Sequence, residues 1–112
     1  MKIREISSTL HDGIVGYSFW CVACNRRHAF YTHDGYTNNR SWTLVSKEPV
    51  TVQPSIKLTG HYGDIENFCC HLFIQNGRLI YLSDCTHHLA GKEVDMIDFP
   101  ISTYEENNED EN

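Results

Sequence analysis

The sequence lacks an apolar run long enough to cross a membrane as a helix. Its first residues include an acid and no apolar segment, so they do not resemble a secretory signal. No long window repeats its apolar residues with the period of a helix, which argues against a helical bundle. We therefore expect a cytoplasmic protein, mainly β in structure and without a membrane partner.

The chain also lacks a basic excess. It has 9 Lys and Arg against 15 Asp and Glu, and a formal net charge of −6. Many of the acids lie in residues 105–112, which leaves a near-neutral body, so nucleic acid is an unlikely partner and a protein is the expected one. A chain of 112 residues predicts one domain, placed at residues 1–104, and the acidic tail 105–112 is expected to be disordered.

Cysteine and histidine are well represented, with five and seven residues respectively. In a cytoplasmic protein such cysteines are read as metal ligands or reactive thiols. Cys21 and Cys24 are separated by two residues at the end of an apolar run, residues 14–21, and a polar turn and a second strand follow. This order is typical of a zinc knuckle, in which both thiolates point at one ion.

Residues 68–91 contain the clearest β-hairpin, because Asn76 and Gly77 favour a two-residue turn between apolar runs. The alternation of side chains then predicts two faces. Cys70 lies on one face with most of the apolar residues, and Cys85 and His87 are within its reach. His71 and Asp84 are neighbours on the other face.

Zinc prefers four tetrahedral ligands from Cys and His, commonly two from a knuckle and two from a second element. We predict a zinc site made by Cys21, Cys24, Cys70 and His87. Cys85 is the leading replacement for one of these ligands. His28 is either a rival ligand or an outer partner.

The hairpin also carries a catalytic hypothesis. Asp84 could orient His71 as a general base, and Cys85 could act as a nucleophile. The alternative is that Asp84 caps a turn and His71 is a satisfied strand residue. The catalytic hypothesis would make the protein a zinc-dependent hydrolase or a Cys/His transferase. A catalytic zinc keeps one coordination position open for water, whereas a structural zinc is closed by four protein ligands.

The expected fold is a small zinc-stabilised antiparallel β meander or partly open barrel with minimal helix. Pro49 and Pro54 indicate that residues 48–55 are extended or turn-like but are not part of a central strand.

The motif CHLFIQNGRLIYLSDCTHHLAG, residues 70–91, resembles a small family encoded by tailed phages, prophages and bacteria. That family often carries the label "ammonia monooxygenase", and nothing in this chain has the spans or ligands of such an enzyme. The upstream residues Cys21, Cys24, His28 and Trp42 match in order, and so does TVQPSI at residues 51–56, although Val22 and Ala23 replace the usual Pro-Gly. The resemblance implies zinc binding and a phage-type protein. From it we expect a protein that acts by binding a host or phage macromolecule, most readily a protein, with interference in a host defence system as its purpose.

Overall fold

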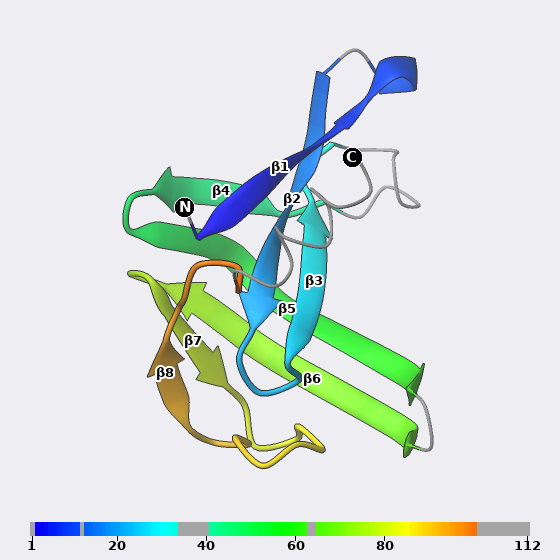
Figure 1. Ribbon diagram of the computed structural model, residues 1–112, viewed down its shortest axis with the longest axis vertical. Helices are drawn as coiled ribbons and strands as arrows, with labels where there is room; N and C mark the ends of the chain where they lie inside the picture. The colour runs from blue at the N-terminus through cyan, green and yellow to red at the C-terminus, as the bar shows by residue number, and fades with distance from the viewer. Residues whose placement is uncertain (1, 12, 34–40, 63–64, 101–112) are drawn as a thin grey trace.

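The structure is a computed structural model that describes residues 2–11, 13–33, 41–62 and 65–100. Its elements are eight strands and one short 3₁₀ helix (Figure 1). In chain order they are β1 (Ile3–Ser8), η1 (Thr9–His11), β2 (Gly13–Cys21), β3 (Arg26–Tyr31), β4 (Thr43–Lys47), β5 (Val50–Tyr62), β6 (Ile65–Gln75), β7 (Arg78–Tyr81) and β8 (Glu93–Asp95).

The strands form two antiparallel sheets, and in each sheet the strands follow one another in chain order. The first sheet has the order β1-β2-β3 and the second has the order β4-β5-β6-β7-β8. The prediction of a mainly β antiparallel meander is therefore confirmed, and the sheets do not close into a barrel. Among the described residues no helix is long and apolar enough to cross a membrane. The acidic tail, residues 105–112, lies outside the described residues.

The β6–β7 hairpin has the predicted turn and register. Asn76 and Gly77 both have positive φ, as a two-residue hairpin turn requires. Across the turn Ile74 pairs with Leu79, and Leu72 pairs with Tyr81. The face predicted to be apolar is buried along its whole length and carries Phe68, Cys70, Leu72, Ile74, Leu79, Tyr81 and Cys85.

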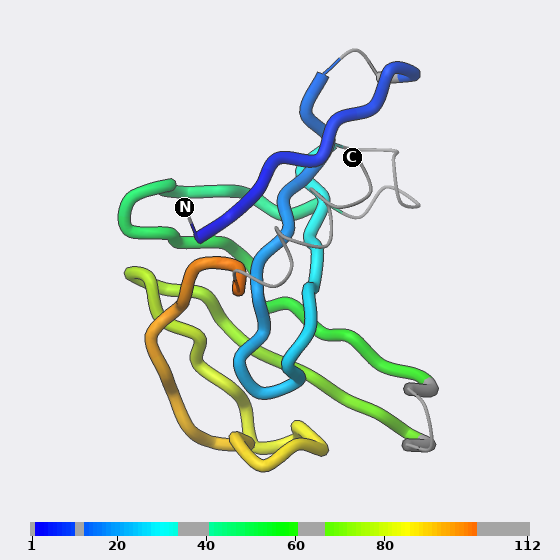
Figure 2. The backbone as a smooth tube through the Cα atoms, in the orientation of Figure 1, coloured from blue at the N-terminus to red at the C-terminus, as the bar shows by residue number. Residues whose placement is uncertain are grey.

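The core lies between this face and the first sheet. The β2–β3 hairpin crosses over β5 and β6 in both backbone views (Figures 1 and 2). Phe19 and Phe30, both fully buried, pack in one cluster with Ile56 and Leu72 of the second sheet. Burial of apolar surface contributes roughly 25 cal/mol per Å², so these contacts hold the two meanders together. The end of β2 is thereby placed over the middle of β6.

Strand β5 differs from the prediction for residues 48–55. It begins at Val50, runs through Pro54 and lies between β4 and β6, so residues 50–55 do belong to a central strand, whereas residues 48–49 form the turn before it. Proline is accommodated because the ladder is interrupted there: Val52 pairs with Ile74 and Ile56 pairs with Leu72, so three residues of β5 face one of β6. Such a bulge needs no N–H from the proline and re-aims the neighbouring side chain, which is Ser55.

Candidate functional site

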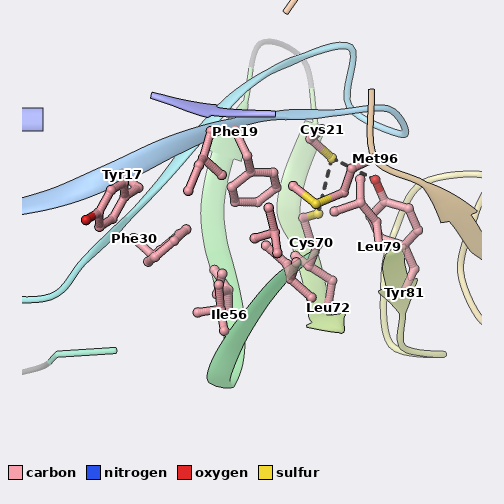
Figure 3. Close-up of a cluster of buried hydrophobic side chains, with 14 of the residues drawn as sticks. Tyr17, Phe19, Cys21, Phe30, Ile56, Cys70, Leu72, Leu79, Tyr81 and Met96 are labelled. Atoms are coloured by element: carbon pink, nitrogen blue, oxygen red, sulfur yellow. Dashed lines mark hydrogen bonds between the residues drawn. The ribbon is translucent and has the colours of Figure 1, made fainter. Parts of the chain in front are cut away.

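A cluster of three cysteines and one histidine lies where the two sheets meet. The ligand atoms of Cys21, Cys24, His28 and Cys70 all lie within 4.8 Å of one another, so the cluster could hold a metal ion. Cys21 ends β2, Cys24 lies in the turn that follows, His28 is in β3 and Cys70 is in β6. Figure 3 shows the sulfurs of Cys21 and Cys70 facing each other, with the Tyr81 hydroxyl beside them.

The spacing of the cluster suits a tetrahedral ion. With Zn–S bonds of about 2.3 Å, two sulfurs of a tetrahedron lie about 3.8 Å apart. The Sγ atoms of Cys21 and Cys70 are 3.9 Å apart. The knuckle is also preformed, because the backbone N–H of Cys24 donates to Cys21 Sγ at 3.4 Å.

The electrostatics of the cluster favour a cation. Hydrogen bonds from Cys24 and Cys70 lower the pKa of Cys21 well below its usual range. The same contacts raise the pKa of Cys24 to about 12 and also raise the pKa of Cys70. Without a cation, ionisation of one of the three thiols is therefore favoured, and ionisation of a second is disfavoured. A divalent ion would neutralise the charge of all three sulfurs, since a coordinating thiol loses its proton.

Hydrogen-bond donors surround the buried sulfurs. The Tyr81 hydroxyl accepts from the backbone N–H of Ala23 at 3.2 Å, which leaves its own proton for Cys21 Sγ, also at 3.2 Å. Burial is the main cause that raises the pKa of Tyr81, so this proton stays on the phenol. Outer donors of this kind orient metal-bound thiolates and moderate their charge.

Two histidines adjoin the cysteines, and their hydrogen bonds distinguish them. His87 Nδ1 accepts the backbone N–H of Leu89 at 3.2 Å. The neutral ring then carries its proton on Nε2, which lies 3.5 Å from Cys70 Sγ and is oriented as a donor to that sulfur. His28, which is 4 % exposed, has a buried Nε2 without a hydrogen-bond partner among the described residues. The geometry favours His28 as the fourth metal ligand and His87 as an outer donor.

A second cluster lies on the opposite face of β6. Ser55 Oγ is 3.1 Å from His71 Nε2. His71 Nδ1 is 3.0 and 3.1 Å from the two carboxylate oxygens of Asp84. The order hydroxyl, imidazole, carboxylate is that of a Ser-His-Asp triad, which is recognised by geometry and roles and not by position in the chain.

Local structure holds Ser55 in place. It occupies the bulge of β5, and its carbonyl accepts the indole N–H of Trp42 at 3.1 Å. The next strand places His71 directly across from Lys57. Trp42 therefore fixes the backbone of the hydroxyl-bearing residue from outside the ladder.

The acid of this cluster has two neighbours, an imidazole and a lysine. The hydrogen bond from His71 is the main cause that holds the pKa of Asp84 below its usual range. Lys57 Nζ lies 3.6 Å from the same carboxylate. Asp84 is thus ionised at neutral pH and accepts a proton-bearing Nδ1, which leaves His71 Nε2 free to accept from Ser55.

Cys85, the predicted nucleophile, faces elsewhere. Its Sγ contacts the backbone of His71, accepting from the N–H at 3.2 Å and donating to the carbonyl at 3.1 Å. It is 9 % exposed, and burial raises the pKa of its thiol. A buried thiol with a raised pKa is a poor nucleophile. The structure thus joins His71 and Asp84, as predicted, but it joins them to a serine.

The two clusters are separate because neighbouring residues of a strand point to opposite faces. Cys70 points into the core with Cys21, whereas His71 points outward to Ser55. A metal ion held by the cysteines would therefore be closed off from the triad.

Ser55 is the member of this cluster that sequence reasoning missed. A serine carries no local signal of reactivity, and its contact with His71 depends on the bulge. The Pro-Ser-Ile match within residues 51–56 is a mark of the family resemblance and does not by itself indicate reactivity.

A family model matches residues 3–82, well over half of the chain, and its description is "Bacterial ubiquitination-like system serine protease (BubE)". No curated protein and no solved structure matches the chain. The match agrees with the bacterial setting of the resemblance and gives no support to the monooxygenase label. It contains Ser55 and His71 and ends two residues before Asp84.

The match corrects one expectation. We expected a zinc-binding protein that acts only by binding a macromolecule, and that prediction is wrong, because the matching family is described as one of proteases. The alternative of an enzyme with its site at the base of the 68–91 hairpin is better supported.

Proposed function

The chain belongs to the family of bacterial ubiquitination-like system serine proteases (BubE), and on that premise we propose that it hydrolyses an amide bond of a protein substrate with Ser55, His71 and Asp84 as its triad. The observation that carries the proposal is the hydrogen-bonded chain from Ser55 Oγ through His71 to Asp84, with distances of 3.0 to 3.1 Å. The proposed partner is thus a protein, as substrate.

Each residue has one role in this reaction. Ser55 Oγ attacks the carbonyl carbon while His71 Nε2 takes its proton, and an acyl-enzyme forms as His71 returns the proton to the leaving amine. Water then attacks the acyl carbon while the same histidine takes its proton, and the histidine returns that proton to Ser55 Oγ as the acyl–oxygen bond breaks. Asp84 holds His71 in the tautomer with Nδ1 protonated and stabilises the imidazolium that forms in each step.

We also propose that the cluster of Cys21, Cys24, His28 and Cys70 holds zinc, since mixed thiolate and imidazole ligands suit this ion. Four protein ligands would close the site, so the ion would have a structural role. The location that we propose is the cytoplasm, where cysteines serve as metal ligands or thiols and disulfides are rare.

The test of the triad compares two possible nucleophiles. An alkyl fluorophosphonate reacts with an activated serine, and mass spectrometry locates the adduct. We expect the adduct on Ser55, its complete loss in Ser55→Ala, and unchanged labelling in Cys85→Ser. Labelling that persists in Ser55→Ala and disappears in Cys85→Ser would transfer the role to the cysteine and refute the proposal.

A further inference from the structure

Strand β5 loses its neighbour on one side immediately beside Ser55. β4 pairs with β5 only as far as Gln53. Beyond the bulge β5 continues and pairs with β6 on its other side, through Gly60 and further. Within the described ranges no strand pairs with the first side of β5 after Gln53. Figures 1 and 2 show this green half of β5 extending past β4. An open sheet edge therefore begins at the proposed nucleophile.

The backbone groups of Lys57 point to this open edge. The residue that pairs with Lys57 on β6 is His71. The carbonyl of His71 accepts from Leu82 N–H at 2.9 Å, and its N–H donates to Cys85 Sγ, so both groups point away from β5. Directly opposed residues in an antiparallel ladder exchange both hydrogen bonds or neither. Lys57 therefore directs its own N–H and C=O away from β6.

The same argument applies two residues further on. Thr59 pairs with Cys69. The carbonyl of Cys69 accepts from Thr86 N–H at 2.9 Å, and its N–H donates to Thr86 Oγ1 at 3.1 Å. Thr59 thus also presents its N–H and C=O to the open edge. Two donors and two acceptors, alternating as an added strand requires, follow Ser55 along the chain.

The outer face beside this edge is hollowed. A groove of about 740 Å³ is lined by Lys57, Thr59 and Asp84, among others. The Lys57 side chain is 52 % exposed. The groove reaches the acid of the proposed triad, Asp84, so side chains of a bound segment would have space on this face of the sheet.

We propose that the substrate binds as an extended peptide added to β5, with main-chain hydrogen bonds to Lys57 and Thr59. This inference rests on the proposed function, because it assigns the substrate to the triad. Main-chain pairing at a sheet edge is an established way to bind an extended peptide. Lys57 and Thr59 lie two and four residues beyond Ser55 along β5. The substrate must therefore be unfolded for roughly four residues on one side of the bond that is cut.

The experiment compares two serine-directed probes on the full chain. One is an alkyl fluorophosphonate without a peptide, and the other is a set of phosphonates that carry tetrapeptide arms of mixed sequence. We expect peptide arms to accelerate labelling of Ser55 at least tenfold over a phosphonate without an arm. Thr59→Pro removes the edge N–H without removing a bond to β6, and proline is tolerated at such edge positions. This variant should lose most of the acceleration and keep its reaction with the alkyl probe, whereas Thr59→Ala, which keeps the N–H, should retain both.

A second measurement uses the unaltered protein and so does not depend on the folding of a variant. Arms methylated at one backbone nitrogen at a time should lose acceleration at alternate positions, because only every second N–H of an added strand points at β5. Absence of acceleration by any arm, full acceleration in Thr59→Pro, or methylation effects without alternation would overturn the inference. If the alkyl probe also fails to label Ser55, the proposed function itself fails.

Discussion

Removal of one thiolate from the buried cluster should unfold the protein and abolish the reactivity of Ser55. Cys70→Ser replaces a fully buried sulfur that lies 3.9 Å from Cys21 Sγ with a hydroxyl that is a poor zinc ligand. Structural zinc contributes about 10–16 kcal/mol of apparent binding free energy at neutral pH. The total stability of a domain is about 5–15 kcal/mol, so little or no folded state should remain without the ion.

The neighbouring residue supplies a matched control. Cys69 lies on the outer face of β6, and Cys69→Ser makes the same change of sulfur to oxygen one position away. We expect one zinc per chain and a wild-type melting transition in Cys69→Ser, and loss of both in Cys70→Ser. Metal content by elemental analysis, thermal melting by circular dichroism and labelling of Ser55 by an alkyl fluorophosphonate measure the three consequences.

The reasoning would be refuted by a Cys70→Ser protein that keeps its zinc and its melting transition. It would also be refuted by a wild-type protein that, stripped of metal by a chelator, still melts cooperatively and still labels at Ser55. In either case the thiols would be ordinary core residues, and the reactivity of the triad would not depend on zinc bound to them.

Three further substitutions test individual residues. Asp84→Asn should lower the rate of Ser55 labelling about 10²-fold. This loss is smaller than the roughly 10⁴-fold loss in a buried triad, because the Asp84 side chain is 45 % exposed and water screens its charge. Asp95→Asn is the matched control and should label at the wild-type rate. Since the pKa of Asp84 is lowered in the folded state, its pairing stabilises the fold above about pH 4 and is lost as pH falls through the lower value, so urea unfolding of the wild type and Asp84→Asn should converge in acid. His28→Gln should abolish zinc binding, whereas His87→Gln should bind zinc with weakened affinity, as measured by metal analysis of both variants. If His87→Gln loses its zinc and His28→Gln keeps it, His87 is the ligand.

The β6–β7 hairpin could be predicted from sequence because its signals are local. Asn76 and Gly77 specify the turn, the turn specifies the register, and the period of two assigns each side chain to a face. The proximity of His71 and Asp84 follows from the same alternation. These parts of the site required no knowledge of the other sheet.

The remaining parts depend on tertiary structure. Pro54 argues against a central strand by its lack of an N–H, but the bulge in β5 removes the need for that donor. The same bulge turns Ser55 toward His71, so the error in the strand and the omission of the serine have one cause. The choice between His28 and His87 depends on the Leu89 N–H, which no spacing of cysteines and histidines reveals.

The adjacency of Cys70 and His71 has a consequence for how β6 can vary. One residue inserted or deleted between His71 and the turn at Asn76, if no bulge absorbed it, would exchange the two faces, so that the sulfur would meet water and the imidazole would enter the core. Both centres would be lost in a single event, although neither residue had been replaced. Between these two residues and the turn, β6 can therefore keep both centres only if a change of length is even or is absorbed by a bulge, while substitutions can alter either centre alone.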